Sequence, residues 1–226
     1  MPPRPLRLLT WNVHGFRSGA YRLTLEPIVA ALAACDADLV ALQEVETRGV
    51  GHAEPLERLR EAFPYQLEAT TIPRAASRYG HALLSRLPLH DECTHDVRYG
   101  GLELRRVLTA CVDRPRGRLR VIAAHLDLAP WARVLQVRRI AALTSASPEP
   151  VVAVGDLNAL SARLLRLATR RHLHLVDTPA SFPDGRPLLA LDRVLCRPHA
   201  LVARTRIADL PRGLSDHLPV EVELDW

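Results

Sequence analysis

Short runs of apolar residues recur along the whole chain and are separated by polar segments. The runs at 6–12 and 150–155, Leu-Arg-Leu-Leu-Thr-Trp-Asn and Pro-Val-Val-Ala-Val-Gly, are typical of buried β-strands. Elsewhere apolar residues stand three and four positions apart, which is the spacing of a helix with one buried face. The pattern predicts strands at 6–12, 38–45, 65–72, 80–85, 103–112, 119–126, 150–155, 188–196, 201–207 and 217–224, and helices at 24–35, 54–63, 131–146 and 161–171.

The order of these elements divides the chain into two similar halves, each with apolar strands, a crossing helix and further strands. No sequence repeat and no linker separates the halves. A length of 226 residues suits one α/β domain, and an apolar share of 48% is enough for a substantial core. We therefore expect one domain over residues 1–226, built from two packed sheets with helices outside.

The chain lacks the signals of a membrane or secreted protein. Its longest apolar stretch, Ile28 to Cys35, is far shorter than the roughly 20 residues that span a bilayer. The N-terminus runs directly into a strand-like segment without an apolar signal region. The four cysteines have no metal-binding or redox spacing, so we expect buried reduced thiols. We expect no integral membrane segment, a cytoplasmic location and, in the absence of a heptad or apolar surface stripe, a monomer.

Basic residues outnumber acidic ones by 30 to 25, which gives a net charge of +5. All 30 are Arg, a bias that reflects genome composition and says little about function. A mildly positive surface suits a substrate that carries phosphate. Charge alone does not distinguish DNA, RNA, lipid headgroups and small phosphate esters.

Several polar residues stand at or just past the ends of predicted strands, where a rigid scaffold presents side chains to a common crevice. Each has a structural explanation when it is taken alone: a surface charge, an Asx turn, a loop residue or a hydrogen-bonded core histidine. The case for function rests on their joint occurrence and order. These residues are Asn12, Glu44, His125, Asp156, Asn158, Asp192, Asp216 and His217.

Seven short motifs that contain these residues resemble, in sequence and order, those of the endonuclease/exonuclease/phosphatase (DNase I-like) superfamily. They extend from residue 10 to residue 219, so the resemblance covers nearly the whole chain. The motifs are Thr10-Trp11-Asn12-Val13-His14, Gln43-Glu44-Val45, Gly80-His81-Ala82-Leu83-Leu84-Ser85-Arg86, His125-Leu126, Gly155-Asp156-Leu157-Asn158-Ala159, Leu191-Asp192-Arg193-Val194 and Ser215-Asp216-His217-Leu218-Pro219.

The resemblance implies a four-layered α/β sandwich, with two packed mixed β-sheets flanked by helices and the site at one end of the sheets. It also implies a metal-dependent hydrolase of phosphate esters. Glu44 would be the main Mg²⁺ ligand, Asn12 would lie beside it, and Asp216 would be near the metal or its waters. These oxygen-bearing side chains suit Mg²⁺, and Mn²⁺ is an alternative.

For the remaining motif residues the resemblance implies roles in catalysis and phosphate binding. Asp192 would accept a hydrogen bond from His217 and fix its tautomer. Asp156 would position or deprotonate the attacking water, and the base role stays open between Asp156 and His217. His125, Asn158 and His217 would contact phosphate oxygens. Arg105 is a further candidate phosphate ligand, although a surface arginine is an equal alternative.

Two positions depart from the family pattern. His81 stands where relatives commonly have Asn, and its role is open between a phosphate contact and a local hydrogen bond. Leu157 replaces the usual Phe, which is an apolar swap that a core tolerates. Because no catalytic position that we can match is lost, we expect an active enzyme.

The substrate is less defined than the reaction. We expect a phosphodiester, and the simplest activity is a nuclease on DNA or RNA. The alternative is a phosphatase or phosphodiesterase that acts on phospholipid, inositol phosphate or another small phosphate ester. A chain of this length has little room for DNA-binding insertions, and an aromatic share of 4% argues mildly against stacking on single strands. A binding module without activity is a third class, which the intact site disfavours.

Overall fold

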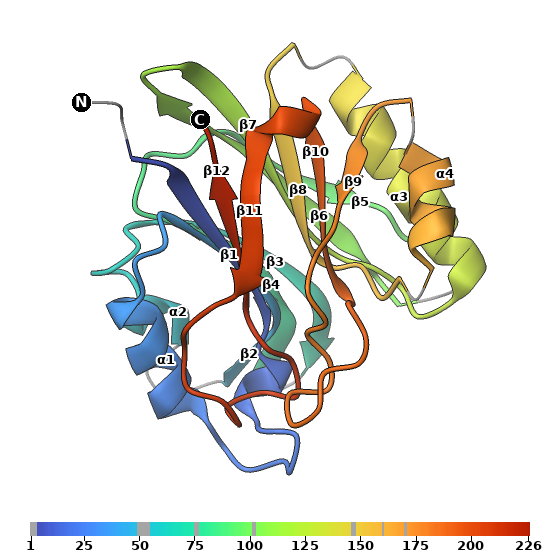
Figure 1. Cartoon of the computed structure of the whole chain (residues 1–226). Coiled ribbons are helices and arrows are strands. Elements are labelled where there is room, and N and C mark those ends of the chain that lie inside the picture. Colours follow the sequence, from blue (N-terminus) through green and yellow to red (C-terminus); the bar gives the residue numbers. More distant parts are fainter. Residues whose placement is uncertain are drawn as a thin grey trace.

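The computed structural model describes residues 4–48, 55–74, 77–100, 103–145, 148–159, 161–169 and 171–226. Within these ranges two six-stranded β-sheets pack face to face, and helices lie on both outer faces (Figure 1). Each sheet contains both parallel and antiparallel pairs of strands. The predicted four-layered α/β sandwich is therefore confirmed.

The first sheet has the strand order β11 (Val202–Ile207), β12 (Val220–Leu224), β1 (Leu6–Asn12), β2 (Leu39–Arg48), β4 (Ser77–Ser85) and β3 (Tyr65–Arg74). The second has the order β5 (His90–Asp96), β6 (Arg106–Arg114), β7 (Gly117–His125), β8 (Val151–Asp156), β10 (Asp192–Arg197) and β9 (His174–Val176). The helices are α1 (Leu25–Ala34), α2 (Pro55–Arg58), α3 (Pro130–Ser145) and α4 (Ala162–Thr169), with short 3₁₀ turns η1 (His14–Phe16) and η2 (His199–Leu201).

Three buried apolar clusters hold the four layers together. One fills the space between the sheets and includes Leu8. A second lies between the first sheet and helices α1 and α2, and includes Leu9 and Ile28. The third lies between the second sheet and helices α3 and α4. Because successive side chains of a strand point to opposite faces, Leu8 and Leu9 enter different clusters. Both faces of the central strands are covered, which explains their continuous apolar sequences.

The strand register brings residues distant in the sequence to one end of the sandwich. Asp156 at the end of β8 pairs with His125 of the parallel strand β7 and with Asp192 of the antiparallel strand β10. In the first sheet Asn12 ends β1 and is in register with Gln43, the neighbour of Glu44. The candidate site residues therefore come from both sheets and meet at the same end.

Two backbone features shape this end of the sheets. The pairing of β2 with β4 shifts between Leu42 and Val45, and Glu44 in this bulge has a φ of 57°, which is uncommon for a residue with a side chain. Gly155 precedes Asp156 and has a φ of 144°. A Cβ atom at Gly155 would lie 1.8 Å from the carbonyl oxygen of Ala124 on the adjacent strand. Only glycine allows β8 to approach β7 this closely.

Several predicted boundaries were wrong. The helix expected at 54–63 is only the single turn α2, and residue 54 lies outside the described residues. Strand β10 begins at Asp192 rather than at 188, and β12 begins at Val220 rather than at 217.

Strand β5 was missed because its sequence, His-Asp-Glu-Cys-Thr-His-Asp, has no apolar run. Its Cys93 is exposed, contrary to the expected buried thiol.

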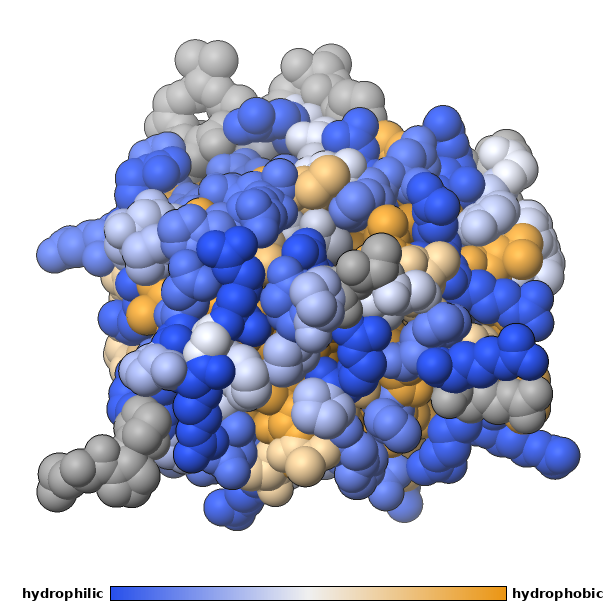
Figure 2. Space-filling view, turned by 90° about the horizontal axis from the view of Figure 1, so that it is seen from above, coloured by the Kyte–Doolittle hydropathy of each residue, from blue (hydrophilic) through white to orange (hydrophobic). Residues whose placement is uncertain are grey.

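The end of the molecule opposite the candidate site is where β1 begins and β12 ends. Figure 2 looks onto that end and shows hydrophilic residues over most of it, with small apolar areas between them. No helix in the described part of the chain is long and apolar enough to cross a membrane.

Candidate active site

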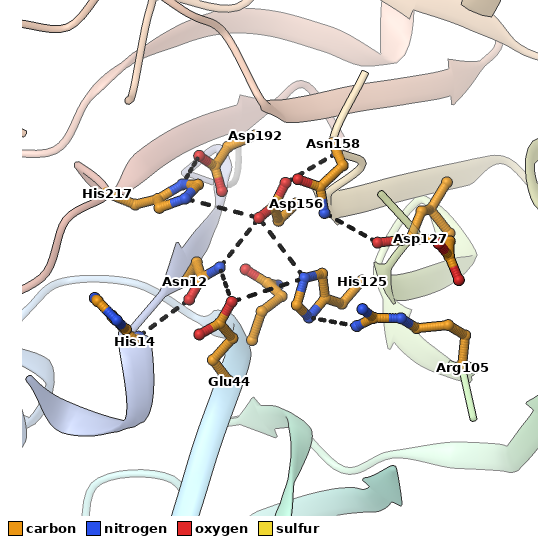
Figure 3. A network of polar contacts seen from close by, with 12 residues as sticks. Asn12, His14, Glu44, Arg105, His125, Asp127, Asp156, Asn158, Asp192 and His217 are labelled. Carbon is orange, nitrogen blue, oxygen red and sulfur yellow. Dashed lines mark hydrogen bonds and ion pairs between the residues drawn. The ribbon is translucent and has the colours of Figure 1, made fainter. Parts of the chain in front are cut away.

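A cavity of about 560 Å³ lies at the end of the sandwich where β7 and β8 finish. Polar side chains from both sheets meet there, and apolar side chains form much of its wall. Its described lining residues are Glu44, Ile72, Tyr79, Glu103, Arg105, His125, Leu128, Pro130, Arg133, Asp156, Asn158, Phe182, Leu191 and His217. Figure 3 shows how the polar members point toward one another.

Asn12 lies beside Asp156, on which most contacts of this polar network converge (Figure 3). Its side-chain N–H groups donate to Glu44 Oε1 and Asp156 Oδ2, both at 3.0 Å. Its Oδ1 accepts a hydrogen bond from the backbone N–H of His14 at 3.0 Å. The buried amide therefore connects the two sheets and offers a donor to each of two carboxylates, which offsets part of their mutual repulsion.

His217 is oriented by a buried carboxylate. Its Nδ1 lies 2.8 Å from Asp192 Oδ2, so the hydrogen bond that the resemblance implied is present. The same oxygen accepts a hydrogen bond from Ser181 Oγ at 2.5 Å. With a proton on Nδ1, Nε2 is directed toward Asp156, whose Oδ2 is 3.8 Å away. Burial alone lowers the pKa of His217, but Asp192 and the neighbouring carboxylates raise it to about 9.

His125, unlike His217, is uncharged. Burial and the nearby Arg105 lower the pKa of His125 well below its usual value, so the ring is neutral at pH 7. Arg105 Nη1 lies 3.4 Å from Nδ1, and because a guanidinium only donates, Nδ1 is the acceptor. The ring proton is then on Nε2, which lies 3.8 Å from Asp156 and 3.9 Å from Glu44. His125 thus presents an N–H donor to the cavity.

Asp156 and Asn158 form a turn directly after β8. The backbone N–H of Asn158 donates to Asp156 Oδ1 at 2.9 Å, and the Asn158 side chain donates to the carbonyl of Leu126 at 2.9 Å. Asn158 has a φ of 50°. Burial and the nearby Asp192 raise the pKa of Asp156, while His217 and hydrogen bonds oppose that rise. The carboxyl of Asp156 is therefore a stronger proton acceptor than an exposed aspartate.

The residues implied as metal ligands suit Mg²⁺ in chemistry. Mg²⁺ takes one or two carboxylates and keeps several waters, so it does not need a complete protein cage. Glu44 supplies a carboxylate at the cavity, and the bulge that gives it a positive φ directs it there. Asn12 adjoins it. Asp216 contacts His14, with Oδ1 3.1 Å from Nδ1, and is outside the described cavity lining. No cluster of three His, Cys, Asp or Glu side chains that could hold a metal occurs among the described residues.

Sequence patterns missed several residues of the site. Ser181 and Phe182 belong to a loop without an apolar run or a motif, yet the ring centroids of Phe182 and His217 are 4.8 Å apart. The Tyr79 hydroxyl contacts Glu44, and burial together with Glu44 raises the pKa of Tyr79 far above its usual value. Arg133 comes from helix α3 and lines the cavity.

His81 is separate from the site. It is buried and does not line the cavity in the described structure. Burial and Arg105 lower the pKa of His81 to about 4, so it is neutral. The structure therefore does not support the phosphate contact that was one of its two alternatives. Arg105, by contrast, is buried and lines the cavity, which removes the alternative of a surface arginine.

Comparison with known proteins agrees with this geometry. The model of the Endonuclease/Exonuclease/phosphatase family matches residues 9–217. The chain is 32% identical over 250 residues to the uncharacterized protein YbhP of Escherichia coli strain K12, a match that covers 96% of this chain and 95% of YbhP.

Solved structures show the same fold. An endonuclease/exonuclease/phosphatase from Beutenbergia cavernae superimposes with a TM-score of 0.80 at 25% identity, over 98% of this chain and 72% of that one. A mannosyl-6-phosphatase from Bacteroides thetaiotaomicron superimposes with a TM-score of 0.72 at 15% identity, over 98% of this chain and 100% of that one. The family match includes strands of both sheets and every candidate site residue from Asn12 to His217, and the chain therefore belongs to the endonuclease/exonuclease/phosphatase family of phosphoester hydrolases.

Proposed function

We propose that this protein hydrolyses a phosphodiester by direct attack of water and uses Mg²⁺ as its cofactor. The observation that carries the proposal is the convergence of Asp156, His125 and the Asp192–His217 pair on one cavity. Such a reaction needs a proton acceptor for water, donors for the charge on phosphate, and a cation. Each of these needs has a candidate residue in the cavity.

The charge state of each residue suits it to a different part of the proposed reaction. Asp156 is suited to orient water and accept its proton, because its raised pKa makes it a better base. His217 carries a proton at neutral pH and is suited to hold a phosphate oxygen through Nε2. Neutral His125 offers a second N–H donor, and Arg105 supports it with positive charge. When bound beside Glu44, Mg²⁺ would supply further positive charge for the phosphate.

The first test uses bis(p-nitrophenyl) phosphate and supercoiled plasmid, each with Mg²⁺ or Mn²⁺ and with or without EDTA. We expect hydrolysis of the small diester that needs the metal and is lost in His217→Ala. Plasmid nicking with the same requirements would identify a nuclease. Hydrolysis of neither diester by the wild-type protein, or activity unaffected by His217→Ala, would contradict the proposal.

A phosphatase or phosphodiesterase for a phospholipid, an inositol phosphate or another small phosphate ester is the second candidate. The cavity wall favours it, because Ile72, Leu128, Pro130, Phe182 and Leu191 offer apolar rather than cationic surface to the rest of the substrate. A panel of phosphomonoesters, inositol phosphates and phospholipids tests it. Robust nuclease activity without turnover of any panel member would exclude this candidate.

Replacing Glu44 by Gln tests the metal ligand. We expect the Mg²⁺ concentration for half-maximal rate to rise by more than about tenfold, since even indirect contacts contribute that much to metal affinity. Glu103→Gln is the matched control, because Glu103 lines the same cavity but pairs with Arg105. Titration of the rate with Mg²⁺ should give the wild-type midpoint for Glu103→Gln. An unchanged midpoint in Glu44→Gln would remove Glu44 from the metal site.

A further inference from the structure

A second cavity adjoins the catalytic one. It has a volume of about 230 Å³, lies between α3 and α4, and shares Pro130 and Arg133 with the catalytic cavity. Val134, Val137, Leu164 and Leu165 give it a predominantly apolar lining. We call this cavity the α3–α4 groove. Apart from Arg133, no charged side chain lines it in the described structure.

Arg133 marks the junction of the two cavities. Its guanidinium donates a hydrogen bond to the backbone carbonyl of Asn158, which lies two residues after Asp156 in the turn that follows β8. Asn158 lies on the side of the network nearest to Asp127 in Figure 3. The α3–α4 groove therefore begins directly behind the catalytic turn, within reach of one substrate molecule that occupies the catalytic cavity.

Apolar side chains continue from the catalytic cavity to the α3–α4 groove. Leu128 and Pro130 line the catalytic cavity on this side, and Leu128 is 72% exposed. Trp131 in the first turn of α3 is 54% exposed, and Leu164 on the far side of the groove is 52% exposed. An apolar surface that is continuous with a polar site is typical of a binding site for a ligand with one polar and one apolar part.

We propose that the α3–α4 groove binds an unbranched alkyl or acyl chain of the substrate, so that the substrate is an amphiphilic phosphate ester. The inference rests on the proposed function for the catalytic cavity, where Arg105, His125 and His217 meet the phosphate. The chain then passes Leu128 and Pro130 into the groove. A nucleic-acid strand would carry a phosphate at every nucleotide along this path, and among its described lining residues the groove offers only Arg133 to pair with them.

Binding of alkyl phosphates tests the inference without turnover. Ethyl, butyl and octyl phosphate are titrated into the protein with Mg²⁺ by calorimetry, below the concentration at which octyl phosphate forms micelles. Each buried methylene contributes about a fourfold gain in affinity, so octyl phosphate should bind more than about tenfold more tightly than ethyl phosphate. Equal affinities across the series for the wild-type protein would overturn the inference.

Two leucines of α4 provide a matched pair of variants. Leu164 and Leu167 are 52% and 53% exposed, but Leu167 lines a different depression and not the groove. Leu164→Gln should lose most of the gain from ethyl to octyl phosphate, whereas Leu167→Gln should keep it. An equal loss in both variants would overturn the inference, because the effect would not come from the groove.

Hydrolysis of bis(p-nitrophenyl) phosphate, measured on the same preparations, keeps the two proposals apart. Chain-length-dependent binding without any hydrolysis would contradict the proposed function and leave the groove as a binding site for alkyl phosphates. Hydrolysis together with binding that does not depend on chain length would support the proposed function. It would overturn the inference that the α3–α4 groove binds an alkyl chain.

Discussion

Replacing Asp192 by Asn should lower kcat for a phosphodiester by about 10²–10⁴-fold, the range that a positioned proton donor or acceptor contributes. The reason is that Asp192 holds Nδ1 of His217 at 2.8 Å and, with the neighbouring carboxylates, keeps the imidazole charged despite its burial. Asn removes the negative charge while it preserves the shape of the side chain. In the metal-free variant, NMR titration should show the pKa of His217 well below the value of about 9 in the parent protein.

A double-mutant cycle distinguishes this positioning role from a purely structural one. His217→Ala alone should also lower kcat by about 10²–10⁴-fold. If Asp192 acts through His217, adding Asp192→Asn to His217→Ala should change kcat little further, because residues that act as a unit are not additive. Independent, multiplicative losses would show that Asp192 contributes by another route, such as its hydrogen bond with Ser181.

Replacing Gly155 by Ala should reduce the free energy of unfolding by more than about 4 kcal/mol, which exceeds the usual cost of a point mutation. The added Cβ would meet the carbonyl oxygen of Ala124 at 1.8 Å, and the φ of 144° disfavours any side chain. Strands β7 and β8 would have to separate in the middle of the second sheet. Urea denaturation, followed by the intrinsic tryptophan fluorescence, measures the loss.

Substitutions at two other glycines distinguish the effect of the steric clash at Gly155 from the effect of its backbone conformation. Gly185 has open space around it and an ordinary φ, so Gly185→Ala should change stability by less than about 1 kcal/mol. Gly213 also has open space but a φ of 75°, so Gly213→Ala should cost about 1–2 kcal/mol. A loss in Gly155→Ala no larger than that in Gly213→Ala would show that the sheet relaxes around the methyl group.

The sandwich and the polar ends of its strands followed from sequence because both depend on local pattern. A strand covered on both faces must be apolar along its length, so the run before Asp156 was recognisable from its residues alone. Polar residues at the ends of such runs mark where the scaffold stops. The pairing of Asp156 with His125 and Asp192 then follows from the strand register.

Contacts that depend on loops were not predictable in this way. Phe182 reaches His217 because backbone hydrogen bonds join its loop to residues 216–218, and nothing in the sequence of the loop indicates that partner. Arg133 enters the cavity only because α3 begins beside it, and one arginine among 30 carries no distinguishing signal. Edge strand β5 is largely exposed and lacks the apolar residues that reveal a buried strand.

The position of β1 has a consequence for how the protein is made on the ribosome. Strand β1 is hydrogen bonded on one side to β2 and on the other to β12, and the Trp11 indole donates to the carbonyl of His217, 206 positions away. Synthesis proceeds from the N-terminus, so Asn12 and Glu44 are translated long before His217. A nascent chain that ends before residue 217 lacks both His217 and β12, the second of the two strands that pair with β1. His217 can therefore complete the polar network around Asn12 and Asp156 only when nearly the whole chain has been translated.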